Sequence, residues 1–168
     1  MPTDGLPDRQ TEYIGEATGP LPTIEVNTAE GPGGSTLTSR AEHDLRARLE
    51  QRDYPACLSD EVYLLHAAQV IHEPHEDKSG RQPGWYSVRV WLEAETPAQV
   101  EECARVFYRL HDTFGSSRRV IATEAKDRAF ELQMTVYGEF AVIAYVERPG
   151  KSPLWLSRFV DLPGRPTD

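Results

Sequence analysis

The sequence of 168 residues is poor in cysteine and has no long apolar run. Its two cysteines, Cys57 and Cys103, lack CxxC spacing, so we expect two reduced thiols in a reducing compartment, with a disulfide between them as the alternative. No run approaches the ~20 apolar residues that a membrane helix needs, and the first residues lack the basic start and apolar centre of a signal peptide. These absences predict a cytoplasmic protein that does not contact a membrane.

A basic surplus is also missing, since the net charge is -9 at pH 7. Binding to nucleic acid is built from clustered Lys and Arg, and the one adjacent basic pair is Arg118-Arg119, so we expect no nucleic-acid partner. The acidic balance instead weakly favours a basic peptide. The run His72-Glu73-Pro74-His75-Glu76 is not followed by further ligands at metal-site spacing, and no glycine loop has phosphate-binding form, so neither a metal nor a cofactor is expected.

Composition divides the chain into four parts. Residues 1–36 carry proline and glycine at short intervals and few aromatic residues, which predicts a disordered tail. Residues 37–57 hold a short helix, about 39–53, and a linker. The helix begins with the Ser39-x-x-Glu42 spacing of a capping box and carries an apolar stripe of Ala41, Leu45 and Leu49. Residues 58–163 form the main domain and residues 164–168 a C-terminal tail.

Within the main domain the apolar residues alternate with a period of two, which is typical of strands that bury one face. Turn residues separate the runs, and residues 97–104 have room for one helical turn. Short strands without long helices between them predict an all-β fold, an antiparallel sandwich of two sheets. The predicted strands are residues 61–72, 85–94, 106–110, 118–123, 128–134, 140–148 and 154–162.

Two segments stand out at strand ends, Leu110-His111-Asp112-Thr113-Phe114 and Val136-Tyr137-Gly138-Glu139-Phe140. The first closes a run in which Val106, Tyr108 and Leu110 share one face and Phe107 and Arg109 the other. The second opens a buried, β-branched run. Both turns are therefore expected at one end of the sandwich.

The two segments, taken in order with Phe130-Glu131-Leu132 between them, resemble the YEATS domain and most closely its prokaryotic form, pYEATS. The strands 84–90 and 154–162 also resemble family elements, so the resemblance covers roughly residues 60 to 163. It implies an immunoglobulin-like sandwich and a non-catalytic reader that holds an acylated lysine, or a similar flat neutral group, in an aromatic slot. Such domains are thought to act as sensors or adaptors in bacterial signalling and conflict systems.

The resemblance assigns a role to each residue of this expected slot. Phe114 and Tyr137 would be the two facing rings, with His111 and Phe140 as walls. Thr113 would bond the acyl amide, and Gly138 would keep the opening clear. The chain differs from the family pattern at Val136, where glycine is usual, and in the loop 79–84, where Arg81 or Gln82 takes the place of an aromatic residue.

Two alternatives stay open from the residues alone. The rings beside the strand ends are also typical of plugs that close a sandwich core, which would leave a protein-interaction module acting through a sheet edge or the 39–53 helix. A hydrolase would pair His111 with Asp112 or Glu139, yet no serine or cysteine nucleophile accompanies them, so enzyme activity is not expected. The sequence does not determine the oligomeric state.

Overall fold

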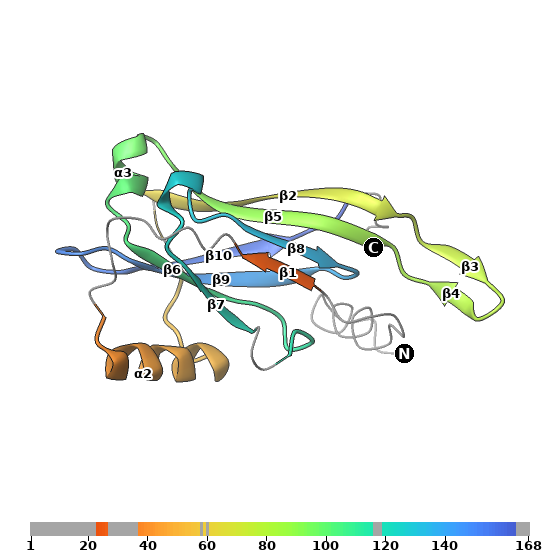
Figure 1. The fold of residues 1–168 in the computed structure, drawn as a ribbon, viewed down its shortest axis with the longest axis horizontal. Coiled ribbons are helices and arrows are strands. Elements are labelled where there is room, and N and C mark those ends of the chain that lie inside the picture. Colours follow the sequence, from red (N-terminus) through yellow and green to blue (C-terminus); the bar gives the residue numbers. More distant parts are fainter. Residues whose placement is uncertain (1–22, 27–36, 58, 60, 116–118, 164–168) are drawn as a thin grey trace.

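The computed structural model of the protein describes residues 23–26, 37–57, 59, 61–115 and 119–163. These residues form two four-stranded antiparallel sheets, which confirms the predicted β-sandwich (Figure 1). The first sheet has the order β1 (Thr23–Val26), β8 (Leu132–Val136), β5 (Trp85–Ala94) and β2 (Val62–His72). The second has the order β10 (Leu154–Val160), β9 (Phe140–Glu147), β6 (Arg105–Arg109) and β7 (Val120–Thr123).

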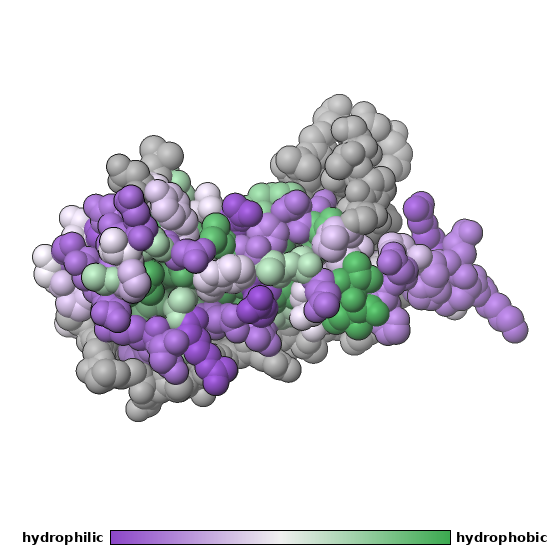
Figure 2. Space-filling view, turned by 90° about the horizontal axis from the view of Figure 1, so that it is seen from above, coloured by the Kyte–Doolittle hydropathy of each residue, from purple (hydrophilic) through white to green (hydrophobic). Residues whose placement is uncertain are grey.

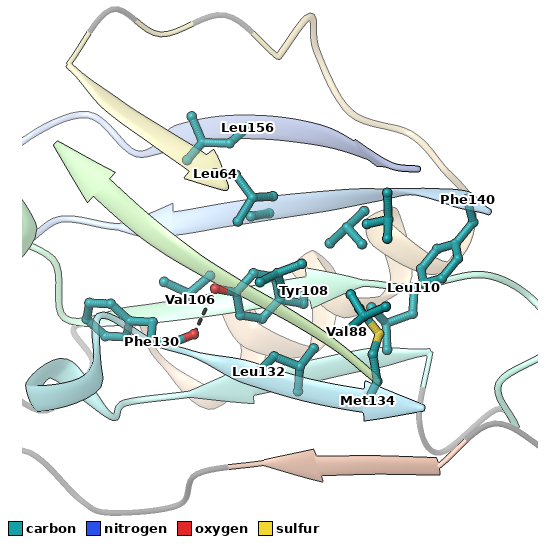
Figure 3. Close-up of a cluster of buried hydrophobic side chains, with 14 of the residues drawn as sticks. Leu64, Val88, Val106, Tyr108, Leu110, Phe130, Leu132, Met134, Phe140 and Leu156 are labelled. Atoms are coloured by element: carbon teal, nitrogen blue, oxygen red, sulfur yellow. Dashed lines mark hydrogen bonds between the residues drawn. The ribbon is translucent and has the colours of Figure 1, made fainter. Parts of the chain in front are cut away.

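The core lies between the sheets and is built by the period-two alternation of the strands. In β5, Tyr86, Val88, Val90 and Leu92 are each at most 1% exposed, while the residues between them face outward. In β6, Val106 and Tyr108 point into the same core, with Leu110 just beyond the strand (Figure 3). The predicted assignment of these residues to the two faces of the strand is therefore confirmed.

A helix covers the outer face of the second sheet. Helix α2 (Ser39–Glu50) buries Leu45 and Leu49 against Phe107, Val120 and Ile143. Leu45 and Leu49 of the predicted apolar stripe therefore pack on the domain itself, whereas Ala41 is only partly buried and is not part of this cluster. The capping residue differs from the prediction, because Thr38 is the N-cap and its Oγ1 accepts a hydrogen bond from the Ala41 amide at 3.1 Å.

Two segments depart from the predicted layout. Thr23–Val26, within the segment 1–36 that was predicted as a disordered tail, pair with β8 as an edge strand. The rest of that tail and residues 164–168 lie outside the described residues. The hairpin of β3 (His75–Asp77) and β4 (Gly80–Gln82), predicted as loop, forms an arm beyond the end of the sandwich (Figure 1). Figure 2 shows that the visible surface of this arm is hydrophilic.

The other predicted elements are found within a few residues of their expected bounds, with one exception. Helix α3 (Pro97–Glu101) follows the capping box of Thr96. The strand predicted over 128–134 begins only at Leu132, because Lys126–Arg128 form the 3-10 helix η1 and Ala129 and Phe130 are left-handed, with φ of 52° and 59°. No helix among the described residues is long and apolar enough to cross a membrane.

Tyr108 ties the left-handed turn to the core. Its hydroxyl is fully buried and donates to the Phe130 carbonyl oxygen at 2.8 Å (Figure 3). Burial raises the pKa of this hydroxyl above its usual range, so it stays protonated and remains a donor.

We expect Tyr108→Phe to lower the free energy of unfolding by about 1–3 kcal/mol, because the Phe130 carbonyl would lose a buried donor. Denaturant unfolding measures the change. Tyr63→Phe is the control, because the Tyr63 ring is 46% exposed and water replaces what its hydroxyl loses, so a change within about 0.5 kcal/mol is expected. Equal losses in the two variants would contradict the assignment.

Candidate functional site

The two predicted turns meet at the end of the sandwich where β6 ends and β8 leads into β9. Phe140, the first residue of β9, joins them: its ring centroid lies 5.8 Å from that of Phe114 and 6.3 Å from that of His111. Both ring pairs are inclined, by 60° and 65°, as aromatic edges and faces prefer. Three of the six candidate residues are therefore in direct contact.

His111 and Thr113 form a polar pair beside these rings. The Thr113 amide donates to His111 Nδ1 at 3.2 Å, and Thr113 Oγ1 lies 3.1 Å from the same nitrogen. A backbone amide can only donate, so Nδ1 is the unprotonated nitrogen and the proton of the neutral ring is on Nε2. The Thr113 hydroxyl then also donates to Nδ1, which leaves its oxygen lone pairs as acceptors. Burial lowers the pKa of His111 and keeps the ring neutral, although Asp112 opposes the shift.

Tyr137 and Gly138 form the bend between β8 and β9. The Tyr137 ring meets Trp85 edge to face, with the centroids 5.0 Å apart and the planes at 79°. Val136 is the last residue of β8 and pairs with Tyr86, so it is extended, and its departure from the family glycine requires no left-handed backbone. Gly138 is buried in the bend.

The candidate rings are part of the core. Phe114 and Phe140 are each 1% exposed and Tyr137 is 4% exposed, and all three belong to the main apolar cluster. Because both expected slot rings, Phe114 and Tyr137, are packed in this cluster, an acyl group can be held between them only after at least one ring has turned. His111 and Thr113 are only half-buried and form the more accessible part of the site.

The side chains that the alternative predictions for this region would use are engaged in other contacts. Asp112 is bound by Arg109 at 2.5 Å and faces Arg52 at 3.4 Å, so it is not paired with the His111 ring as an acid–base partner. Glu139 Oε2 accepts from the Leu162 amide at 2.8 Å. Gln82 bonds Asp77 within the arm at 3.3 Å.

Sequence reasoning missed the residue that makes the most contacts next to the site, Arg109. It is 4% exposed, and its guanidinium donates to the carbonyls of Leu49 and Glu50, at 2.9 and 3.4 Å, and to that of Leu110. The hydrogen bond from Arg109 is the main cause that lowers the pKa of Asp112. The available signal was an arginine within an apolar strand followed by an aspartate three residues later.

Residues 86–161 match the family model of the prokaryotic YEATS domain. The match supports a prokaryotic YEATS domain in this part of the chain. The match runs from β5 to just beyond β10 and contains all six candidate residues, whereas β1, α2 and β2 precede it. No curated protein matches the chain. The match indicates a YEATS-like binding module whose kind of partner is a protein or peptide. The described residues contain no group of three or more His, Cys, Asp or Glu side chains placed to hold a metal ion.

The lowered pKa of His111 predicts a pH dependence of stability. The unfolded chain takes up a proton near the ordinary value of 6.5, and the folded chain only at lower pH. The unfolded state therefore binds more protons between these two values, so this contribution is complete above pH 6.5 and is lost as the pH falls below it.

We expect the free energy of unfolding to fall less between pH 7 and pH 5 in His111→Asn than in the native protein. Asparagine retains an acceptor for the Thr113 amide but does not titrate. Denaturant unfolding at a series of pH values measures this difference, with His43→Asn, on an exposed helix position, as the matched control. Identical pH profiles for the native protein and His111→Asn would contradict the assignment.

Proposed function

We propose that the protein is a reader of acylated lysine, or of a similarly flat neutral group, which binds where the loops of the sandwich carry His111, Thr113, Phe114, Tyr137, Gly138 and Phe140. The observation that supports this most directly is the His111–Thr113 hydrogen bond, held against the Phe114 and Phe140 rings inside a prokaryotic YEATS domain. In this proposal the site binds and does not catalyse, and the chain serves as a sensor or adaptor in bacterial signalling or conflict systems.

The polar pair offers both hydrogen-bonding functions that a secondary amide needs. Thr113 Oγ1 gives its proton to His111 Nδ1 and can accept the amide N–H of the ligand. The Nε2–H of His111 makes no hydrogen bond within the described residues and can donate to the acyl carbonyl. An amide that loses water on binding would therefore keep both of its hydrogen bonds.

The rings provide selection for an acyl group over a charged amine. A flat acyl amide gains contact with aromatic faces, whereas an ammonium would lose its hydration. The two carboxylates nearest in sequence do not compensate, because Asp112 is bound by Arg109 and Glu139 by the Leu162 amide. The ring that turns to admit the ligand loses its contact with Phe140, if it is Phe114, or with Trp85, if it is Tyr137, and regains an apolar contact with the acyl chain.

Titration with acetyl-lysine and crotonyl-lysine peptides tests the proposal, with NMR signals of the Phe114 and Tyr137 rings as the readout. We expect shifts of both rings with the acylated peptides and none with the unmodified peptide. Thr113→Val should weaken binding by about tenfold, because one hydrogen bond of the amide is lost.

Thr123→Val is the matched control for this change. The Thr123 hydroxyl accepts from the Ala125 amide at 3.2 Å, and the residue pairs with Val106 at the opposite end of the sandwich. Its loss should lower stability without changing affinity. Absence of ring shifts at millimolar acylated peptide, with the protein folded, would refute acyl-lysine recognition.

The burial of the three rings favours a second candidate, a protein-interaction module in which they only close the core. The apolar stripe of α2 is already buried on the domain, so a partner would bind an edge of a sheet. This candidate expects Tyr137→Ala to lower stability in proportion to the apolar area lost and to leave association with the partner intact.

A further inference from the structure

Helix α2 lies outside the matched part of the chain, yet its last turn is bound to the loop that carries the candidate site. Leu45 and Leu49 fix the helix on the outer face of the second sheet, against Phe107 and Ile143. This places the C-terminal end of the helix next to the residues that follow β6.

Arg109 makes the central connection between the two. Its Nε donates to Leu49 O at 2.9 Å and its Nη2 to Glu50 O at 3.4 Å, so it binds two carbonyls of the last helical turn. The same guanidinium donates to Leu110 O and to Asp112 Oδ1, both in the site loop. One buried side chain therefore holds a helix end and a loop at once.

Two further arginines, Arg52 and Arg119, also connect the end of the helix to the site loop. Arg52, just past the helix, faces Asp112 with Nη2 3.4 Å from Oδ1. Arg119 donates from Nε to Phe114 O at 3.3 Å and from Nη1 to Glu50 Oε2 at 3.3 Å, and its carbonyl accepts from the Leu110 amide at 2.7 Å. The loop is thus held at Leu110, Asp112 and Phe114.

The helix end is itself well defined. Arg52 has a left-handed φ of 57°, its amide donates to Leu49 O at 3.2 Å, and the Asp53 amide donates to Arg48 O at 2.8 Å. This is the hydrogen-bond pattern of a Schellman motif, in which glycine is the usual left-handed residue. An arginine at this position directs a cation towards Asp112.

We propose that Arg109 is a positioning residue, and that through it the last turn of α2 and the loop 110–114 form one structural unit that sets the geometry of the binding site. Undocking the helix then disturbs the His111–Thr113 pair, and a change in the loop disturbs the helix end. The statement about the site rests on the proposed function, whereas the coupling of helix and loop does not.

Amide hydrogen exchange measured by NMR tests the coupling without a ligand. Two variants act on this connection: Arg109→Lys, at the connecting residue, keeps the charge but not the fork of donors, and Leu45→Glu, on the helix alone, undocks the helix. We expect both to speed exchange of the Thr113 and Phe114 amides by at least about tenfold while the Val88 amide in β5 stays slow.

Arg148→Lys is the matched control. Arg148 is also buried, donates to Ser152 O at 2.9 Å and pairs with Glu61 at 2.7 Å, but it follows β9 at the opposite end of the sandwich. It should leave exchange of the Thr113 and Phe114 amides within about twofold of the native rate.

The reciprocal change is Asp112→Ala, which alters a side chain that is 57% exposed and so leaves the fold intact even if the other variants unfold. Because coupling is mutual, it should speed exchange of the Arg52 and Asp53 amides at the helix end. Faster exchange only on the side that was mutated, in both Leu45→Glu and Asp112→Ala, would overturn the proposal.

Affinity for the acetyl-lysine peptide separates this proposal from the function it rests on. If the native protein binds the peptide, Arg109→Lys and Leu45→Glu should weaken binding at least about fivefold, and unchanged affinity in both would overturn the positioning role. If the native protein binds no acylated peptide, the proposed function fails, and the exchange comparison alone decides whether helix and loop are one unit.

Discussion

Strand β6 is buried on both faces, and the arrangement of the other elements follows from this constraint. Its inner residues, Val106 and Tyr108, complete the core between the sheets, while Phe107 and Arg109 are equally buried on the outer side. An outer sheet face that carries a phenylalanine and an arginine needs both an apolar cover and acceptors for the guanidinium. Helix α2 supplies both, through Leu45 and Leu49 and through the carbonyls of its last turn.

The loop that carries half of the candidate site residues follows directly after the same strand. Leu110, the residue after β6, is buried on the core side, and Phe114 packs with the rings at the end of the sandwich. Asp112 lies on the outer side, where it pairs with Arg109. The loop is thus held from two directions, by ring contacts within the core and by arginine contacts beneath the helix. A loop fixed in this way presents His111 and Thr113 in one geometry, which a binding site for a small amide requires.

Patterns within single strands predicted the fold well, because alternation directly reports which face is buried. The strand Trp85–Ala94 has the predicted bounds, and the residues of β6 lie on the faces of the strand that alternation predicted.

The structure differs from the prediction where no local pattern exists. Ala129 and Phe130 are left-handed because Tyr108 and the η1 turn hold them, although neither residue type signals a turn. The strand Thr23–Val26 depends on a partner more than 100 residues away. Arg109 was placed on the correct face, but its role depends on a helix 60 residues earlier. The assignment of the six site residues stays a prediction.

The candidate rings can be buried and still admit a ligand only if the ring side chains move while the backbone of the loop stays fixed. A ring can turn about its side-chain torsions while its backbone stays fixed, and the contacts of Arg109 and Arg119 are made to the backbone carbonyls of Leu110 and Phe114. If the open arrangement were populated at about 1%, the apparent affinity would be about a hundredfold weaker than the intrinsic one. A looser backbone would make ring opening easier, but it would also separate His111 from Thr113, the pair to which the proposed function assigns the amide. The arginine contacts therefore favour a site in which the rings respond to the ligand and the polar pair does not.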